Sequence, residues 1–231
     1  MRLDKHLHQC LGISRSQASL LLRSGRITVN GAITKSGSLH VNEQDVILLD
    51  DKNLQKPGEN LYYFMLHKPQ GYVCANADAN HPGITQLFDI PQADELHAAG
   101  RLDVDTTGLV LVTNDGQWSH RVTSPRKQCD KTYRVWLADP VSDETSKLFA
   151  EGILLRSETQ PTRPAQLEIV TPCEVLLTIH EGKYHQVKRM FAAVGNHVER
   201  LHRERIGALN LDANLPEGSF RALTAEEISL F

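Results

Sequence analysis

The chain has 231 residues, of which 40% are hydrophobic, 23% are charged and 6% are aromatic. This composition excludes a disordered, collagen-like or disulfide-scaffold protein, and the length suits a small plus a medium domain. No apolar run approaches the roughly 18 residues that span a bilayer, and the first residues lack the apolar core of a signal peptide. The four cysteines are far apart, so we predict no disulfide or thiolate metal site and expect a cytoplasmic protein.

Basic residues are concentrated in three segments. The formal net charge is −3, but residues 1–40 carry +5, residues 121–134 carry +4 and residues 183–205 carry +4. The remaining residues carry −16. A single basic segment indicates a solvated surface, whereas three of them favour a face that binds RNA or DNA on an otherwise acidic body.

The first 49 residues predict a small module of two helices and a sheet. Apolar spacing predicts a helix over residues 4–11, and Ser14 with Gln17 forms an S-x-x-Q capping box that opens a second helix. Asn30-Gly31 is a hairpin signal between two short strands, and residues 45–49 form a further strand. This core is marginal by itself, so we expect a tethered accessory domain.

Residues 50–60 (DDKNLQKPGEN) are polar and predict a linker to a second domain over residues 61–231. We expect strands at 62–66, 71–75, 108–113, 131–137, 165–170, 174–179, 197–203 and 208–211. Helices are expected over 186–194 and from Thr224, where Glu227 completes a second capping box. Many strands and few helices indicate an α+β domain on a mostly antiparallel sheet.

An acidic loop precedes the apolar strand at 108–113. A purely structural interpretation is an Asx-type turn in which aspartates cap backbone N–H groups. A second interpretation is D-x-D-x-T, the nucleophile motif of Mg²⁺-dependent phosphatases, which Asp103, Asp105 and Thr107 match. In that class the motif follows an apolar strand, whereas here the strand comes afterwards, so the phosphatase is a minor alternative.

The histidines at 180, 185, 197 and 202 raise the question of a zinc site. Their spacing matches no common ligand pattern and no thiolates accompany them. We therefore expect surface or RNA-facing histidines and no bound metal.

Four segments occur in order: 67–74 (HKPQGYVC), 100–116 (GRLDVDTTGLVLVTNDG), 131–133 (KTY) and 181–190 (EGKYHQVKRM). Together they resemble the motifs of the RsuA family of pseudouridine synthases, and the first module resembles the α-L RNA-binding domain of a small-subunit ribosomal protein. The resemblance implies a catalytic domain on a mostly antiparallel mixed sheet with flanking helices. It also implies isomerisation of a specific uridine in 16S rRNA without a cofactor.

The resemblance makes Asp103 the catalytic carboxylate and Lys188 the cation that keeps it ionised in a largely apolar pocket. Tyr133 aligns with an active-site tyrosine. Its ring is expected to stack on the uracil, and its hydroxyl is expected to help move the C5 proton. Arg101 is expected to hold the flipped-out nucleotide. Arg189, about 100° round the helix from Lys188, is expected to face RNA or another carboxylate.

Phosphate contacts in the first module are expected from Arg15, Arg23, Arg26 and Lys35. The implied partner is 16S rRNA or a small-subunit assembly intermediate, with no membrane and no obligate protein partner, and we expect a monomer. A non-catalytic RNA-binding assembly factor also explains the charge segregation. That alternative does not explain why Asp103 and Lys188 occur within these motifs.

Overall fold

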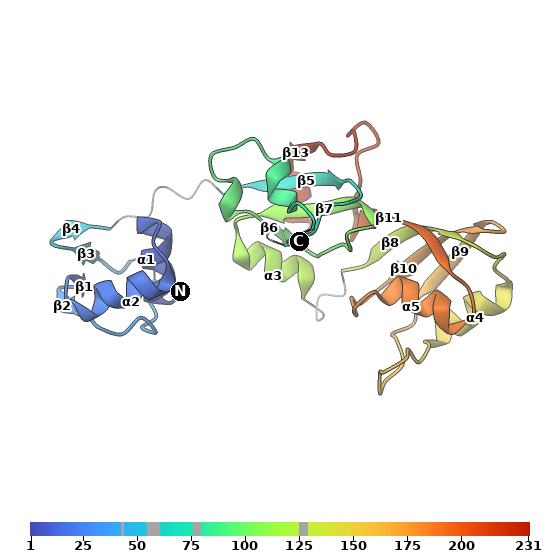
Figure 1. The fold of residues 1–231 in the computed structure, drawn as a ribbon, viewed down its shortest axis with the longest axis horizontal. Helices are drawn as coiled ribbons and strands as arrows, with labels where there is room; N and C mark the ends of the chain where they lie inside the picture. Colours follow the sequence, from blue (N-terminus) through green and yellow to red (C-terminus); the bar gives the residue numbers. More distant parts are fainter. Residues whose placement is uncertain (43, 55–60, 76–79, 125–128) are drawn as a thin grey trace. The chain divides into compact units, whose positions relative to one another are not determined.

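The computed structural model describes residues 1–42, 44–54, 61–75, 80–124 and 129–231. The chain divides into two compact units, Met1–Asn60 and Leu61–Phe231 (Figure 1). Each unit has its own hydrophobic core and is described by itself.

The first unit packs two helices on a four-stranded sheet. Its elements are α1 (Leu3–Leu11), α2 (Arg15–Arg23), β1 (Ile27–Val29), β2 (Ala32–Ile33), β3 (Ile47–Leu49) and β4 (Lys52–Asn53), with strand order β2-β1-β3-β4. The predicted capping box is confirmed, because Gln17 N–H donates to Ser14 Oγ and Ser14 N–H donates to the Gln17 side chain. Leu3, Leu22 and Ile47 lie in the core that joins the helices to the sheet.

Both turns of this sheet use residues with positive φ. The predicted turn at Asn30-Gly31 is confirmed, with φ of 52° and 81°. Asp50 and Asp51, with φ of 48° and 63°, form a second two-residue turn, after which β4 pairs with β3. The expected linker is therefore wrong at 50–54, because aspartate tolerates this conformation and continues the sheet. Residues 55–60 of that segment lie outside the described residues.

The second unit is built on one sheet. Its strands are β5 (Tyr63–Lys68), β6 (His97–Ala99), β7 (Thr107–Thr113), β8 (Lys131–Leu137), β9 (Gln166–Thr171), β10 (Glu174–Ile179), β11 (Val198–Ile206), β12 (Leu209–Asn210) and β13 (Phe220–Ala222). The order is β13-β5-β7-β11-β8-β10-β9, with β6 beside β7 and β12 beside β11. The β7–β11 pair is parallel and the other named pairs are antiparallel, which confirms the mostly antiparallel α+β domain.

Helices cover both faces of this sheet. The helices are α3 (Gly116–Thr123), α4 (Asp143–Glu151), α5 (Gln186–Ala193) and α6 (Ala225–Ser229), with short 3₁₀ segments η1 (Ile84–Leu87) and η2 (Ala93–Glu95). Phe149 of α4 and Phe191 of α5 pack with Val110 and Val135 on one face. Trp118 of α3 packs with alternate residues of β5 and β7 on the other face. Because β7 is covered on both sides, its central residues 109–112 are all apolar.

Helices α3 and α4 and strands β6 and β13 were not predicted, and one expected strand is absent from the described residues. Asp115 caps α3 by accepting hydrogen bonds from the N–H groups of Gln117 and Trp118, and α4 begins after Ser142. The expected strand at 71–75 is wrong: within it Val73 makes an isolated bridge to Gly83. Since one bridge continues no ladder, the segment is a loop.

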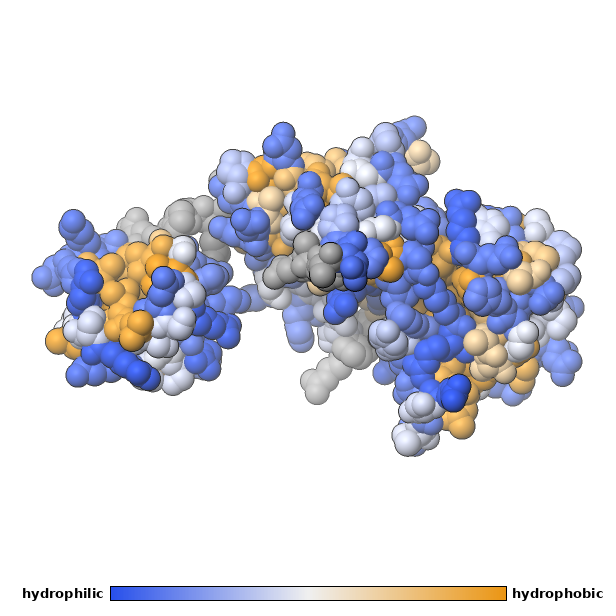
Figure 2. Space-filling model, viewed as in Figure 1, coloured by the Kyte–Doolittle hydropathy of each residue, from blue (hydrophilic) through white to orange (hydrophobic). Residues whose placement is uncertain are grey.

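Apolar side chains gather on the visible face of the first unit in Figure 2. An open groove of the first unit is lined mainly by leucine and isoleucine side chains, with Gln17, Ser24 and Arg26 among its polar residues. Among the described helices, none combines the length and apolar character that crossing a bilayer requires.

Candidate active site

The loop between β6 and β7 carries the candidate carboxylate. Thr106 N–H donates to the Asp103 carbonyl at 3.1 Å, and Leu102 N–H donates to Cys74 Sγ at 3.3 Å. Gly100 enters the loop with φ of +97°, which favours glycine. The Asp103 side chain is 30% exposed, so it is held by the loop and remains reachable from solvent.

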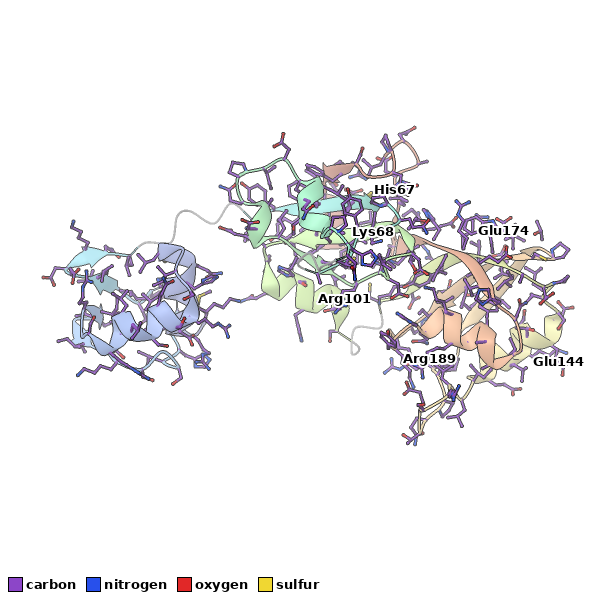
Figure 3. All side chains as sticks on the ribbon, viewed as in Figure 1. His67, Lys68, Arg101, Glu144, Glu174 and Arg189 are labelled. Carbon is purple, nitrogen blue, oxygen red and sulfur yellow. The ribbon has the colours of Figure 1, made fainter. Side chains whose placement is uncertain are left out.

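Two buried cations bind the carbonyls of this loop. Lys68, at the end of β5 (Figure 3), donates from Nζ to the carbonyl oxygens of Pro69 (3.0 Å), Val104 (3.4 Å) and Thr106 (2.8 Å). Burial lowers the pKa of the Lys68 ammonium from its usual range. The fixed carbonyls nevertheless give it three acceptors, which satisfies its donors without water.

Arg203 of β11 binds the other end of the loop. Its guanidinium donates to the carbonyls of Leu109 (2.7 Å), Gly100 (2.9 Å) and Arg101 (3.4 Å), and the residue is 1% exposed. Gly108 permits this arrangement, because a Cβ there would lie 2.3 Å from the carbonyl oxygen of Arg203. The parallel β7–β11 pairing therefore depends on the absence of a side chain at Gly108.

Lys188 of α5 lies between two carboxylates. Its Nζ is 3.4 Å from Oδ2 of Asp103, and 2.6 Å and 2.8 Å from the two carboxylate oxygens of Asp105. Burial raises the pKa of Asp105, but the hydrogen bond and charge of Lys188 outweigh it, and the net pKa lies below the usual range. The structure thus brings the sequence-predicted acid and lysine together from segments that are far apart in the chain.

His185 is a further neighbour of Asp103, although the sequence indicates only a surface or RNA-facing histidine. Its Nε2 lies 3.4 Å from Oδ1 of Asp103. His185 immediately precedes α5 and has φ of +46° and ψ of 37°, a conformation that is uncommon for a residue with a Cβ. Its place within the 181–190 motif is the one sequence signal that could have pointed to the site.

Tyr133 of β8 is 7% exposed and lies in the same core layer as Leu102. Nη1 of Arg203 donates to the Tyr133 hydroxyl at 3.4 Å, and the guanidinium carbon lies 5.9 Å from the ring centroid. Because the hydroxyl oxygen accepts this bond, its own proton is available for a different acceptor.

The two arginines expected to bind substrate behave differently. Arg101 is exposed and precedes β7 (Figure 3). Arg189 of α5 donates to Glu158 at 3.1 Å and to the carbonyls of Tyr184 (3.0 Å) and Arg156 (2.6 Å). Arg189 therefore faces a carboxylate of its own chain, the second of the two placements that its position on the helix allows.

The histidines named for a possible zinc site do not converge. His180 Nδ1 contacts Asp130 at 2.5 Å, His185 contacts Asp103, and His202 Nδ1 contacts the Thr107 hydroxyl at 2.8 Å. Within the described ranges no group of three His, Cys, Asp or Glu residues is arranged to hold a metal ion.

A polar hollow of about 230 Å³ lies away from this chemistry. It is lined by Thr132, Gln166, Glu168, Leu176, Thr178, Glu204, Arg205 and Asn210. Thr132 and Tyr133 are neighbours on β8 and point to opposite faces of the sheet. The hollow therefore opens on the face opposite Tyr133.

In the first unit, Arg15, Arg23 and Lys35 are exposed. Arg26 is also exposed, and its Nε donates to Asp50 at 2.9 Å. An RNA phosphate would have to compete with that carboxylate at Arg26, whereas the structure describes no such ion pair at the other three.

Comparison with known proteins gives two family matches. Residues 62–193 match the family model described as RNA pseudouridylate synthase, and residues 1–47 match the S4 domain. The chain belongs to the RNA pseudouridylate synthase family. As a member of this family of isomerases it is an enzyme, which argues against both the non-catalytic factor and the phosphatase.

Curated relatives in this family align along nearly the whole chain. The "Ribosomal small subunit pseudouridine synthase A" of Haemophilus influenzae is 56% identical over 228 residues, covering 99% of this chain and 98% of the relative. The protein of the same name from Escherichia coli strain K12 is 55% identical over 230 residues, covering 99% of each. A solved structure described as "Crystal structure of pseudouridylate synthase" is 54% identical, with a TM-score of 0.75 and full coverage of both chains.

Proposed function

We propose that this family member converts one specific uridine of small-subunit (16S) ribosomal RNA to pseudouridine, with Asp103 as the reacting carboxylate and without a cofactor. The observation that carries the proposal is the position of Asp103. Lys68 and Arg203 bind carbonyls of its loop, and Lys188 and His185 contact its carboxylate. The substrate class is supported by the S4 domain and by the names of the relatives.

The proposed reaction exchanges one bond for another within a nucleotide. The N1–C1′ glycosidic bond breaks, the uracil turns, and a C5–C1′ bond forms. The proton on C5 leaves and N1 gains a proton, so atoms and electrons balance with no redox partner. A carboxylate serves each route to this product: attack on C1′, attack on C6 of the ring, or removal of the 2′ proton.

Each neighbour of Asp103 has a role in this proposal. Lys188 would place its ammonium beside Oδ2 of Asp103 and His185 would contact Oδ1, so that both carboxylate oxygens are oriented. The Tyr133 ring would lie against the uracil. Its hydroxyl, which accepts a hydrogen bond from Arg203, would help move the proton that leaves C5. Arg101, exposed beside the loop, would hold the phosphate or sugar of the target nucleotide.

The target nucleotide would have to leave its helical stack to reach Asp103, because C1′ and C5 are inaccessible within a stacked helix. Unstacking costs a few kcal/mol, and phosphate contacts would offset part of it. In the first unit Arg15, Arg23 and Lys35 would supply such contacts, with Arg26 after exchange of Asp50. The proposal places a monomer in the cytoplasm with 16S rRNA or a small-subunit assembly intermediate.

Tritium release from a 16S rRNA transcript labelled at C5 of uridine tests the catalytic assignment. We expect wild-type protein to release tritium, and Asp103→Asn to bind the transcript with nearly unchanged affinity but release none. Asp105→Asn is the matched control, because it changes the other carboxylate on Lys188 and should retain measurable release. Tritium release by Asp103→Asn would overturn the assignment, as would a result in which Asp105→Asn is the only variant that releases none.

A further inference from the structure

A largely exposed aromatic ring stands beside the candidate site. Tyr184 is 76% exposed. Its ring stacks on that of His185, with centroids 3.8 Å apart and planes 20° from parallel. One face of the tyrosine is therefore covered by histidine, and the other is turned to solvent.

The backbone beneath this ring is firmly held. Arg189 donates to the carbonyl of Tyr184 at 3.0 Å, and Arg189 is itself bound to Glu158. The Gln186 side chain, 4% exposed, accepts from Lys183 N–H at 2.8 Å and donates to Glu181 at 3.0 Å. These bonds restrain the segment on both sides of Tyr184, so the exposed ring is presented by a prearranged support.

His185 connects this ring to the chemistry. It takes a positive φ, and in that conformation its Nε2 reaches Asp103 at 3.4 Å while its ring lies under Tyr184. The histidine ring therefore contacts Tyr184 through its face and Asp103 through its edge. A base that reacts at Asp103 and a base that rests on the outer face of Tyr184 would be different bases.

We infer that Tyr184, backed by His185, is a stacking platform for an unpaired base next to the target uridine in the RNA strand. The inference rests on the proposed function, since it takes Asp103 as the position of the target nucleotide. Proteins that bind single-stranded RNA stack splayed bases on exposed aromatic side chains. A neighbouring base captured here would help hold the strand open while the target uridine occupies the site.

Phosphate binding is the alternative to stacking at this position. Lys183 and Arg189 share the single carboxylate of Glu158, so these three groups together carry one net positive charge. A contribution from phosphate contacts falls steeply with salt concentration, whereas a stacking contribution does not. The two origins therefore give different salt dependences for the effect of changing Tyr184.

Equilibrium binding to a whole 16S rRNA transcript tests the platform without knowledge of the modified position. We expect Tyr184→Ala to weaken binding by about 5- to 150-fold, the range for loss of one base–aromatic stack. Tyr184→Phe should bind like wild type, and Tyr184→Leu should resemble the alanine variant. Leu230→Ala is the control, because Leu230 is an exposed apolar side chain, 49% exposed, next to α6, which packs on the sheet face opposite α5.

Two further measurements give the origin of the effect. The ratio of wild-type to Tyr184→Ala affinity should stay constant as salt is raised. In a short RNA spanning the modified uridine, an abasic nucleotide at one adjacent position should remove the difference between the two proteins. A loss below twofold, a ratio that falls with salt, or a difference that survives abasic substitution on either side would overturn the platform. Tritium release by wild-type protein reports the proposed function separately.

Discussion

Replacement of Arg203 by methionine is expected to destabilise the second unit strongly. The change leaves the carbonyls of Gly100 and Leu109 buried without their donors, which lie at 2.9 Å and 2.7 Å in the native protein. Each charge-assisted hydrogen bond contributes about 1.5–3 kcal/mol, and relief from burying the cation offsets part of the loss. We therefore expect a loss of about 3 kcal/mol in the free energy of unfolding.

Urea denaturation followed by tryptophan fluorescence measures this loss in the intact chain. Both tryptophans, Trp118 and Trp136, lie in the second unit, so the signal reports that unit. With a urea slope of about 3 kcal/mol per molar for a domain of this size, the midpoint should fall by about 1 M. Arg200→Met, on the same strand but exposed and lying 4.2 Å over Trp136, should change stability by less than about 1 kcal/mol. Equal midpoints for Arg203→Met and wild type would refute the assignment of a structural role to the buried guanidinium.

Three further changes test the site and its surroundings. Gly108→Ala should prevent native packing of β7 on β11, because the new Cβ would lie 2.3 Å from the Arg203 carbonyl at φ of +108°; a native-like near-UV circular dichroism spectrum would contradict this. The depressed pKa of Asp105 means that its pairing with Lys188 stabilises the fold above the ordinary aspartate pKa and is lost as pH falls through the folded pKa. Asp105→Asn should therefore flatten the acid limb of stability, measured as urea midpoints from pH 3 to pH 6. Burial lowers the pKa of His202 below 6.5, so neutral His202 stabilises the fold above pH 6.5 and this stabilisation is lost as pH falls through the folded pKa. An NMR titration that gives His202 a pKa above 6.5 would contradict this.

Much of the fold follows from local sequence patterns. The strands at 131–137 and 174–179 agree with the structure at both ends, and alternate side chains of each, such as Tyr133 and Val135, are buried on one covered face. Helix α3 was not predicted, although Asp115 supplies its cap, because its eight residues bury only two apolar side chains, Trp118 and Val122, too few for a helical period to stand out. The hairpin at Asp50-Asp51 was missed because two aspartates with positive φ are a weaker turn signal than Asn-Gly.

The candidate site was predictable only where a motif carried it. The family resemblance named Asp103 and Lys188, and their contact joins residues 85 positions apart, which no local pattern specifies. Lys68 and Arg203 were missed because lysine and arginine are rarely fully buried, and a sequence does not display the carbonyls that accept their hydrogen bonds. His185 was missed because its contact with Asp103 depends on an unusual backbone conformation.

The parallel contact between β7 and β11 has a consequence for the order in which the enzyme matures during synthesis. Asp103 and Lys68 belong to the part of the sheet formed by β5 and β7, whereas Tyr133 and Arg203 belong to the part formed by β8 and β11. The β7–β11 register joins residues about 95 positions apart, so it forms after the nearby hairpins. A nascent chain that has exposed only its first 190 residues already contains the S4 domain but lacks the strand that completes the loop around Asp103. Under the proposed function, RNA contact by the first unit would therefore precede catalytic competence in the life of each molecule.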